Sequence, residues 1–430
     1  MHFLIENSTQ FEKLTPQNEC FVQVVPLSYA YHPKLTSISV IYYRSIDKGY
    51  IFSIKHSETE SLELQSVLDF ISKHDKVFVL DKKFHSYFLN PKNLVDVFFC
   101  LKENSNRVDF KTSIQLEYEL KYFDRSDTNA LIPVGKHYEH LENVFEYYKG
   151  NFFKCENWED LSNVIDSYFY VENNSIGVNE SFFDVYTVNN KKHSYDGKGL
   201  YTHYNMYNQT GRPTNTFNGV NFVAIPKDEE HRSCIIPQNE YFVEYDFDGY
   251  HVRLIANKLG VKLPETSIHE YLGKQYFNKE KLTEEDYKAS KTITFRQLYG
   301  GVMEEYSHID LFKKMGQFIK DLWESYDNNK FIKLPTGSTL YYNKEMTPLK
   351  VFNYYVQNME TKNNSDRVKL VREILKGKKT KLVLITYDAF LFDFDCADGK
   401  DLLLSIKSAL ETGGYPTKHK YGKNYFLQQS

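Results

Sequence analysis

The sequence lacks the features that would place it in several broad classes of protein. Its five cysteines among 430 residues show neither CxxC nor other metal-type spacing, which argues against a zinc site and for reduced thiols. No apolar run approaches the roughly 20 residues that a membrane helix needs. Internal repeats, a signal peptide and a low-complexity tail are missing too. We therefore expect a soluble cytoplasmic protein with no membrane partner.

An excess of positive charge is also missing. Lys and Arg number 53 against 57 Asp and Glu, a net charge of −4, so any binding of nucleic acid would have to use local basic patches. Aromatic residues, by contrast, are abundant, with 35 Tyr and 32 Phe. A hydrophobic content of 41% over this length is enough for a large core divided between two or three domains.

The order of patterns along the chain predicts a mixed α/β layer in the first part and a second part with a different succession of strands and helices. Three strand-like runs, a helix and another strand occupy residues 19–110, and a helix over 135–148 precedes a boundary at about residue 150. From residue 200 the chain changes character. One strand ends at Asp246, and residues 268–327 have mostly helical patterns. A late hairpin carries Asp388 near its tip.

One lysine and three aromatic residues are spaced four apart within YKASKTITFRQLYG, residues 287–300. Tyr287, Lys291, Phe295 and Tyr299 are four apart and share one face of a helix. Such a stripe is usually core packing, but a buried lysine would need a partner for its charge. The alternative is a platform for a nucleotide, which offers phosphate, sugar and base.

Two aspartates, Asp246 and Asp388, stand at strand ends among apolar residues. Each alone is open to interpretation as a turn or helix-cap residue. Two carboxylates on neighbouring strands are also what a pair of Mg²⁺ ions needs for an in-line phosphoryl displacement.

Five stretches, in order, resemble the successive motifs of family A DNA polymerases, the bacterial polymerase I type: TGRPTNTFNGVNFVAIP, YDFDGYHVRLIA, KTITFRQLYG, FNYYVQN and ITYDAF. The resemblance covers roughly residues 200–425. It implies a right-hand palm and fingers over 200–430, with fingers at about 262–330. The implied activity is template-directed addition of dNTPs to a primer 3′-hydroxyl on primed DNA with two Mg²⁺ ions.

The resemblance also implies roles for individual residues. The metal ligands would be Asp246, Asp388 and the Phe247 carbonyl, and Lys291 would join the two aspartates as a catalytic residue. Nucleotide binding would fall to His269, Lys288, Lys291, Phe295, Tyr299 and His251. Contacts to DNA would come from Arg212, Asn221, Asn353 and Gln357, at positions where hydrogen bonds orient the duplex without reading its sequence.

Three departures from the family pattern stand out. His251 replaces a glutamate beneath the sugar, where its imidazole either pairs with the Tyr299 hydroxyl as the glutamate would or is a tolerated core histidine. Tyr287 replaces an arginine that contacts the phosphates, a loss that Lys288 beside it would partly offset. Ala389 replaces an accessory carboxylate after Asp388.

The first 150 residues resemble an RNase H-like 3′–5′ proofreading exonuclease that has lost its acids. Four acidic metal ligands are needed there, yet no carboxylate occurs over residues 20–46, His85 replaces an aspartate, and a glutamate replaces the aspartate of the third motif, at 138–142. We expect an inactive domain. Residues 151–199 would form a reduced thumb, which implies low processivity unless a processivity factor or other replication protein assists.

Small size and lost proofreading resemble a phage- or virus-encoded enzyme, which would act in the host cytoplasm. Two other functions stay open from the sequence. One is a polymerase with relaxed sugar selectivity that makes RNA or mixed strands, as His251 would allow. The other is a non-catalytic DNA-binding replication or virion protein that retains the fold.

Overall fold

The computed structural model describes residues 3–45, 47–100, 128–155, 158–208 and 210–429. The chain forms two compact units, Met1–Phe169 with Asn189–Gly197, and Tyr170–Val188 with Lys198–Ser430. The division therefore falls at Phe169 rather than at the predicted boundary near residue 150. Residues 151–199, predicted as a reduced thumb, are shared between the two units, so a separate thumb stays a prediction.

The first unit is built on a six-stranded sheet in the order β1-β4-β3-β2-β5-β6. The strands are β1 (Leu4–Ile5), β2 (Glu19–Pro26), β3 (Ile38–Arg44), β4 (Gly49–Ser53), β5 (Lys76–Val79) and β6 (Leu94–Asp96). Strands β2, β3 and β4 pair antiparallel, whereas β5 joins β2 and β6 joins β5 in parallel. This mixed order, with a meander on one side and parallel strands on the other, is the arrangement expected of the predicted α/β layer.

Alternation along the central strand gives this sheet two apolar faces. Cys20, Val22 and Val24 pack in one core cluster with helix α2 (Leu64–Ser72). Phe21 and Val25 point the other way, into a cluster with helix α6 (Val134–Tyr148). Successive strand residues face opposite sides, so one continuous apolar run serves both layers.

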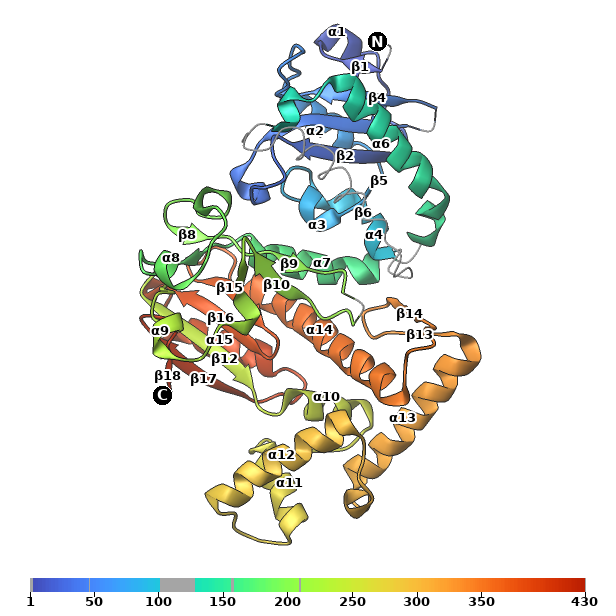
Figure 1. Ribbon diagram of the computed structural model, residues 1–430. Coiled ribbons are helices and arrows are strands. Elements are labelled where there is room, and N and C mark those ends of the chain that lie inside the picture. The colour runs from blue at the N-terminus through green and yellow to red at the C-terminus, as the bar shows by residue number, and fades with distance from the viewer. Residues whose placement is uncertain (1–2, 46, 101–127, 156–157, 209, 430) are drawn as a thin grey trace. The chain divides into compact units, whose positions relative to one another are not determined.

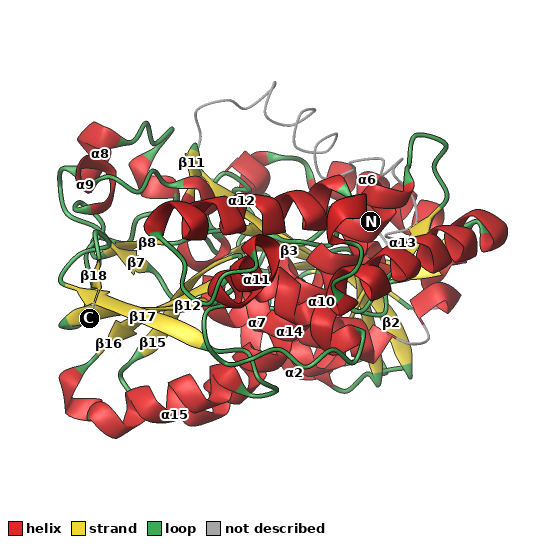
Figure 2. Ribbon diagram, turned by 90° about the horizontal axis from the view of Figure 1, so that it is seen from below, coloured by secondary structure: helices red, strands yellow, loops and turns green. Residues whose placement is uncertain are grey.

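The second unit contains a five-stranded antiparallel sheet in the order β15-β16-β12-β17-β18. Its strands are β12 (Tyr241–Phe247), β15 (Lys381–Thr386), β16 (Ala389–Phe394), β17 (Thr417–Gly422) and β18 (Gln428–Gln429). The predicted hairpin around Asp388 is β15–β16. Helix α15 (Lys400–Glu411) runs beside this sheet, as Figure 2 shows from below.

Helices carry the chain away from the central strand and back. They are α10 (Tyr250–Lys258), α11 (Ile268–Phe277), α12 (Glu284–Gly300), α13 (Asp310–Asn329) and α14 (Pro348–Ile374). Residues from all five share one apolar cluster that includes Ile255, Leu272, Leu298, Phe312 and Phe352. Figure 1 shows α14 alongside the sheet, with α11 and α12 together beyond α10.

A glycine makes the turn from β12 into α10. Gly249 has φ 61°, and a Cβ built there would lie 2.1 Å from the Ile268 side chain. The left-handed conformation and the close approach both require glycine. The turn places α10 directly after Asp246. None of the described helices is both long and apolar enough to cross a membrane.

Candidate active site

Strands β12 and β16 bring Asp246 and Asp388 together at one end of the sheet. Asp246 pairs with Ala389 in the antiparallel register, and the Phe247 N–H donates to the Asp388 carbonyl at 3.0 Å. Burial and then the charge of Asp388 raise the pKa of Asp246 to about 6. Burial and then the charge of Glu360 raise the pKa of Asp388. Burial and neighbouring negative charge thus outweigh the nearby lysine, arginine and histidine side chains, and a bound cation would relieve both effects.

The donor set at this pair is small. Over the residues that the structure describes, no three or more His, Cys, Asp or Glu side chains are grouped to hold a metal ion. Mg²⁺ takes oxygen ligands and is commonly held by one or two carboxylates together with substrate phosphates. Asp246 and Asp388 therefore fit Mg²⁺ that is bound together with a triphosphate, and the Phe247 carbonyl stays a predicted further ligand.

The turn before Asp388 has an unusual backbone conformation. Tyr387 has φ 61°, a left-handed value that is uncommon for a bulky residue. Two neighbours hold it there: the Arg212 guanidinium lies 3.6 Å from the centre of the Tyr387 ring, and the Asn364 amide donates to the Tyr387 carbonyl at 2.8 Å. The position of Asp388 thus depends on a clamped residue directly before it.

Helix α12 spans the predicted stripe, and the stripe is not core. Phe295 is 43% and Tyr299 41% exposed, and Lys291 is exposed as well. The face turned inward is instead made of Ser290, Thr294, Gln297 and Leu298. Phe295 and Tyr299 stack with their ring centres 6.2 Å apart. A cation and two parallel rings are therefore presented on one open face of the helix.

His269 lies against this stripe from helix α11. Its ring centre is 5.7 Å from that of Phe295 and 6.3 Å from that of Tyr287. Burial lowers the pKa of His269 to about 4, an effect that Asp248 opposes and Lys291 reinforces. The buried Nδ1 atom has no hydrogen-bond partner among the described residues. The sequence placed His269 at the nucleotide, and the structure brings it to Lys291 and Phe295.

The two residues at the start of the stripe behave differently. The Tyr287 hydroxyl lies 3.4 Å from the Ser267 hydroxyl, at the start of α11. Lys288 forms an exposed ion pair with Glu284 at 2.6 Å, one turn earlier. Such i,i+4 pairs on a helix surface are weak, so this one leaves Lys288 able to exchange partners.

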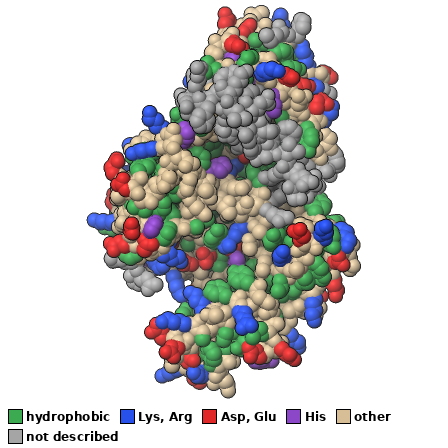
Figure 3. Space-filling view, in the orientation of Figure 1, with side chains coloured by type: hydrophobic (Ala, Val, Ile, Leu, Met, Phe, Trp, Pro, Cys, Tyr) green, Lys and Arg blue, Asp and Glu red, His purple; other side chains and the backbone are tan. Residues whose placement is uncertain are grey.

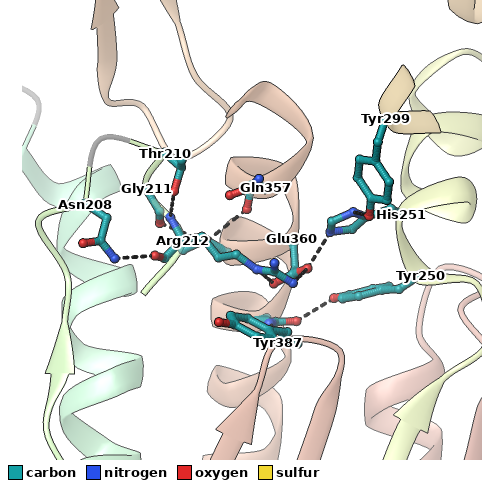
Figure 4. A network of polar contacts seen from close by, with 12 residues as sticks. Asn208, Thr210, Gly211, Arg212, Tyr250, His251, Tyr299, Gln357, Glu360 and Tyr387 are labelled. Atoms are coloured by element: carbon teal, nitrogen blue, oxygen red, sulfur yellow. Dashed lines mark hydrogen bonds and ion pairs between the residues drawn. The ribbon is translucent and has the colours of Figure 1, made fainter. Parts of the chain in front are cut away.

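His251 is bonded on both sides of its ring, as Figure 4 shows. Its Nδ1 lies 2.7 Å from the Tyr299 hydroxyl, the contact expected if the imidazole takes the place of the glutamate. Its Nε2 lies 2.5 Å from Glu360 Oε2, on helix α14. Burial raises the pKa of Tyr299 to about 12, and Glu360 and Asp388 add to the rise. Tyr299 thus lies within electrostatic reach of Asp388.

The four predicted DNA contacts are divided. Arg212 is bound to Glu360 through both Nε and Nη2, each at 2.8 Å. Asn353 and Gln357 lie one turn apart on α14, and the Asn353 Oδ1 atom is buried with no partner among the described residues. Asn221 is exposed at the end of β11 (Val220–Asn221). The structure brings Arg212 to Tyr387, directly before Asp388, whereas no contact of Asn221 with either aspartate is seen among the described residues.

Glu360 is a site residue that the sequence did not reveal. It lies within VQNMETKNN, where polar neighbours give no sign that the carboxylate is buried. Its partners Arg212 and His251 are 148 and 109 residues away. Only the fold brings the three together.

In the first unit, His85 and Glu142, which stand where the exonuclease pattern has acids, both form hydrogen bonds within the protein. His85 accepts the Val24 N–H at Nε2, 3.1 Å away, so Nδ1 carries the proton and donates to the Asp81 carbonyl at 2.6 Å. Glu142 accepts the Tyr42 hydroxyl at 2.6 Å and pairs with Arg44 at 3.2 Å. Neither His85 nor Glu142 is placed as a metal ligand.

Charge over the second unit is mixed. In Figure 3, Lys and Arg side chains lie interspersed with Asp and Glu around α11 and α12. This agrees with the net charge of −4 and with local rather than global attraction of phosphate.

Comparison with solved structures supports the predicted fold. No family model matches the sequence, and no curated protein matches it. The chain is similar to the solved structure of the POL domain of Pol1 from M. smegmatis in complex with DNA primer-template and dNTP. The likeness has a TM-score of 0.65 at 12% identity and covers 95% of this chain and 96% of that one. The predicted fold class is thereby confirmed.

Proposed function

We propose that this chain is a template-directed DNA polymerase. The primer 3′-hydroxyl attacks the α-phosphate of a dNTP, the new phosphodiester bond forms, and pyrophosphate leaves. One observation carries the proposal: Tyr299, on the open stripe of α12, is hydrogen-bonded to His251 at the start of α10, the helix that follows Asp246. Tyr299 lies within reach of the Asp388 charge and is bonded to His251, five residues after Asp246. The fold of the Pol1 POL domain supports the same conclusion.

The side chains divide the work of binding. Lys291 offers a point charge to the triphosphate, and His269 beside it donates to the same oxygens once their charge favours its protonated form. Phe295 stacks on the nucleotide and Tyr299 limits the site at the nascent pair. Holding primer and triphosphate in line is the main contribution, because positioning supplies much of the rate in phosphoryl transfer.

The carboxylates would hold the metal. Asp246 and Asp388, with the Phe247 carbonyl, are the groups for two Mg²⁺ ions. When bound, the ions stabilise the charge that develops on the attacking and leaving oxygens. The raised pKa of Asp246 means that a bound cation would favour the state in which both carboxylates are ionised.

The first unit is proposed to be a scaffold without proofreading. Exonuclease chemistry of this kind needs paired metal ions on several acids. His85 and Glu142 are instead used in structural contacts. The proposed thumb at 151–199 and the dependence on a processivity factor follow from the small size of that segment. An origin in a phage or virus is part of the same proposal.

Deoxyribonucleotides are proposed as substrates because His251 is fixed. A ring bonded at both nitrogens, to Tyr299 and to Glu360, has little freedom to move away from a 2′-hydroxyl. Competition of each rNTP against its dNTP on one primed template tests this. Equal incorporation of both would favour the enzyme with relaxed sugar selectivity.

Primer extension on a labelled primed template with Mg²⁺ and dNTPs tests the whole proposal. We expect extension by the wild type and none by Asp388→Asn, with duplex binding retained. The matched control is Asp393→Asn, a buried aspartate on the same strand that accepts from the Gln238 and Asn239 N–H groups. It should extend primers at near the wild-type rate.

Two outcomes of the same assay would contradict the proposal. Absence of extension by the wild type would leave a DNA-binding protein without catalysis. In a parallel reaction without dNTPs, the labelled strand should keep its length, and steady shortening would show an active exonuclease.

A further inference from the structure

Glu360 lies at the centre of a polar network inside the second unit. It is 2% exposed, and its carboxylate faces two partners from distant elements (Figure 4). Arg212 donates to it through Nε and Nη2, each at 2.8 Å. His251 Nε2 lies 2.5 Å from Oε2. The two oxygens are thus shared between the loop before strand β10 (Thr214–Phe217) and helix α10.

This carboxylate is held ionised. Burial by itself would raise its pKa, but the hydrogen bond and charge of His251, followed by those of Arg212, outweigh burial and leave the pKa lowered. A buried charge is tolerated only when paired and hydrogen-bonded, and removal of one partner is costly because the other charge stays behind. Arg212, His251 and Glu360 therefore depend on one another for their positions.

Each partner of Glu360 contacts a second residue of the proposed active site. His251 continues to the Tyr299 hydroxyl on the open stripe of α12. Arg212 continues to the ring of Tyr387, which has a left-handed backbone directly before Asp388. One carboxylate consequently connects the nucleotide side of the site with the turn that carries a proposed metal ligand.

We propose that Glu360 is a positioning residue that sets Tyr299, through His251, and the Tyr387–Asp388 turn, through Arg212, at the same time. The inference rests on the proposed polymerase function. Glu360 touches neither substrate nor metal in this role. Its charge fixes two side chains whose orientations would otherwise be independent.

The first test is the variant Glu360→Gln, which keeps the shape and removes the charge. Steady-state primer extension should show kcat reduced and KM for dNTP raised, with kcat/KM lower by about 10- to 100-fold, the usual loss when a group that orients an active-site residue is removed. Both constants change because one partner serves the nucleotide and the other the reacting end. Glu360→Asp, which keeps the charge, should recover part of the loss.

The second test is a mutant cycle, which shows whether Arg212 and Glu360 act as one unit on kcat/KM. Arg212→Met leaves the buried carboxylate with His251 as its remaining partner, so it should lower kcat/KM strongly. The double variant Arg212→Met/Glu360→Gln removes the unpaired charge and should be several-fold more active than Arg212→Met alone. The effects of the two substitutions on kcat/KM should therefore be strongly non-additive.

Glu172 supplies the matched control. This glutamate is fully buried, accepts the Tyr204 N–H at 2.7 Å and faces His203 at 3.4 Å. Glu172→Gln should lower the melting temperature without moving kcat or KM. If Glu360→Gln behaves in the same way, or if the double variant is no better than Arg212→Met, the positioning role is wrong. A wild-type protein that extends no primer would instead remove the proposed function itself.

Discussion

Removing the Asp388 charge should stabilise the protein when no divalent cation is bound. The pKa of Asp246 is raised from 3.8 to about 6 by burial and then by Asp388. A shift of this size corresponds to about 3 kcal/mol. Asp246 keeps some solvent exposure, so screening reduces the value to about 1–2 kcal/mol. The part due to Asp388, together with the desolvation of Asp388 itself, makes a gain on the order of 1 kcal/mol for Asp388→Asn.

Thermal melting measures this gain. In chelator at neutral pH, Asp388→Asn should melt about 2–4 °C above the wild type, the shift expected for about 1 kcal/mol in a unit of this size. With saturating Mg²⁺ and a dNTP the order should reverse, because the ion and the triphosphate bind the folded wild type together and stabilise it by mass action. Asp393→Asn should melt below the wild type in both buffers, since its amide keeps an acceptor for only one of the two backbone N–H groups and places a donor opposite the other.

The pH dependence has a definite sign. The folded-state pKa of Asp246 lies above its unfolded value, so ionisation opposes folding at pH values above about 6 and is relieved as the pH falls from about 6 to about 4. The advantage of Asp388→Asn in chelator should therefore shrink over that interval. The reasoning is refuted if Asp388→Asn melts below the wild type in chelator, or if Mg²⁺ with a dNTP stabilises both proteins equally.

Two further predictions concern the stripe and the first unit. Lys291→Ala should raise KM for dNTP at least tenfold, measured by primer extension, whereas Lys288→Ala, which loses an exposed pair with Glu284, should change KM less than threefold; equal effects would contradict the assignment. His137 is buried, donates from Nε2 to the Asn129 carbonyl and has its pKa lowered to about 4 by burial, so the unfolded state takes up its proton first. Stability of the first unit to urea should fall by about 3 kcal/mol as the pH drops from about 6.5 to about 4, and His137→Gln should flatten that dependence.

Local pattern was enough to predict the elements that carry the site. The four-residue spacing of the stripe predicted a helix at 287–300, and α12 runs from Glu284 to Gly300. It begins where Thr283 and Asp286 form a capping box, a short-range signal that the sequence also contains. The strand ending at Asp246 and the hairpin around Asp388 were predicted for the same reason. Apolar alternation and turn residues act within a few positions of each other.

Contacts between segments far apart in the sequence could not be predicted from local residue patterns. The periodicity of the stripe was compatible with core packing, and only the placement of α12 over α11 showed which face is buried. The extent of the first unit to Phe169 also depends on packing, because helix α7 (Trp158–Glu172) crosses the end of that unit and no local signal marks the crossing. Contacts of high sequence separation are set by the whole fold.

The network around Glu360 holds a negative charge close to Tyr299, but not at the position where the family resemblance expects it. The family resemblance places a glutamate at the position of His251, paired with the tyrosine that here is Tyr299. In this chain the imidazole takes that pairing, at 2.7 Å, and the carboxylate lies directly behind it, at 2.5 Å from the other ring nitrogen. The imidazole thus lies between the Tyr299 hydroxyl and a buried carboxylate. The negative charge then needs its own counter-ion, and Arg212 supplies it through a two-point contact. Arg212, His251 and Glu360 form one interdependent unit, and motif comparison finds the departure at His251 but not the carboxylate behind it.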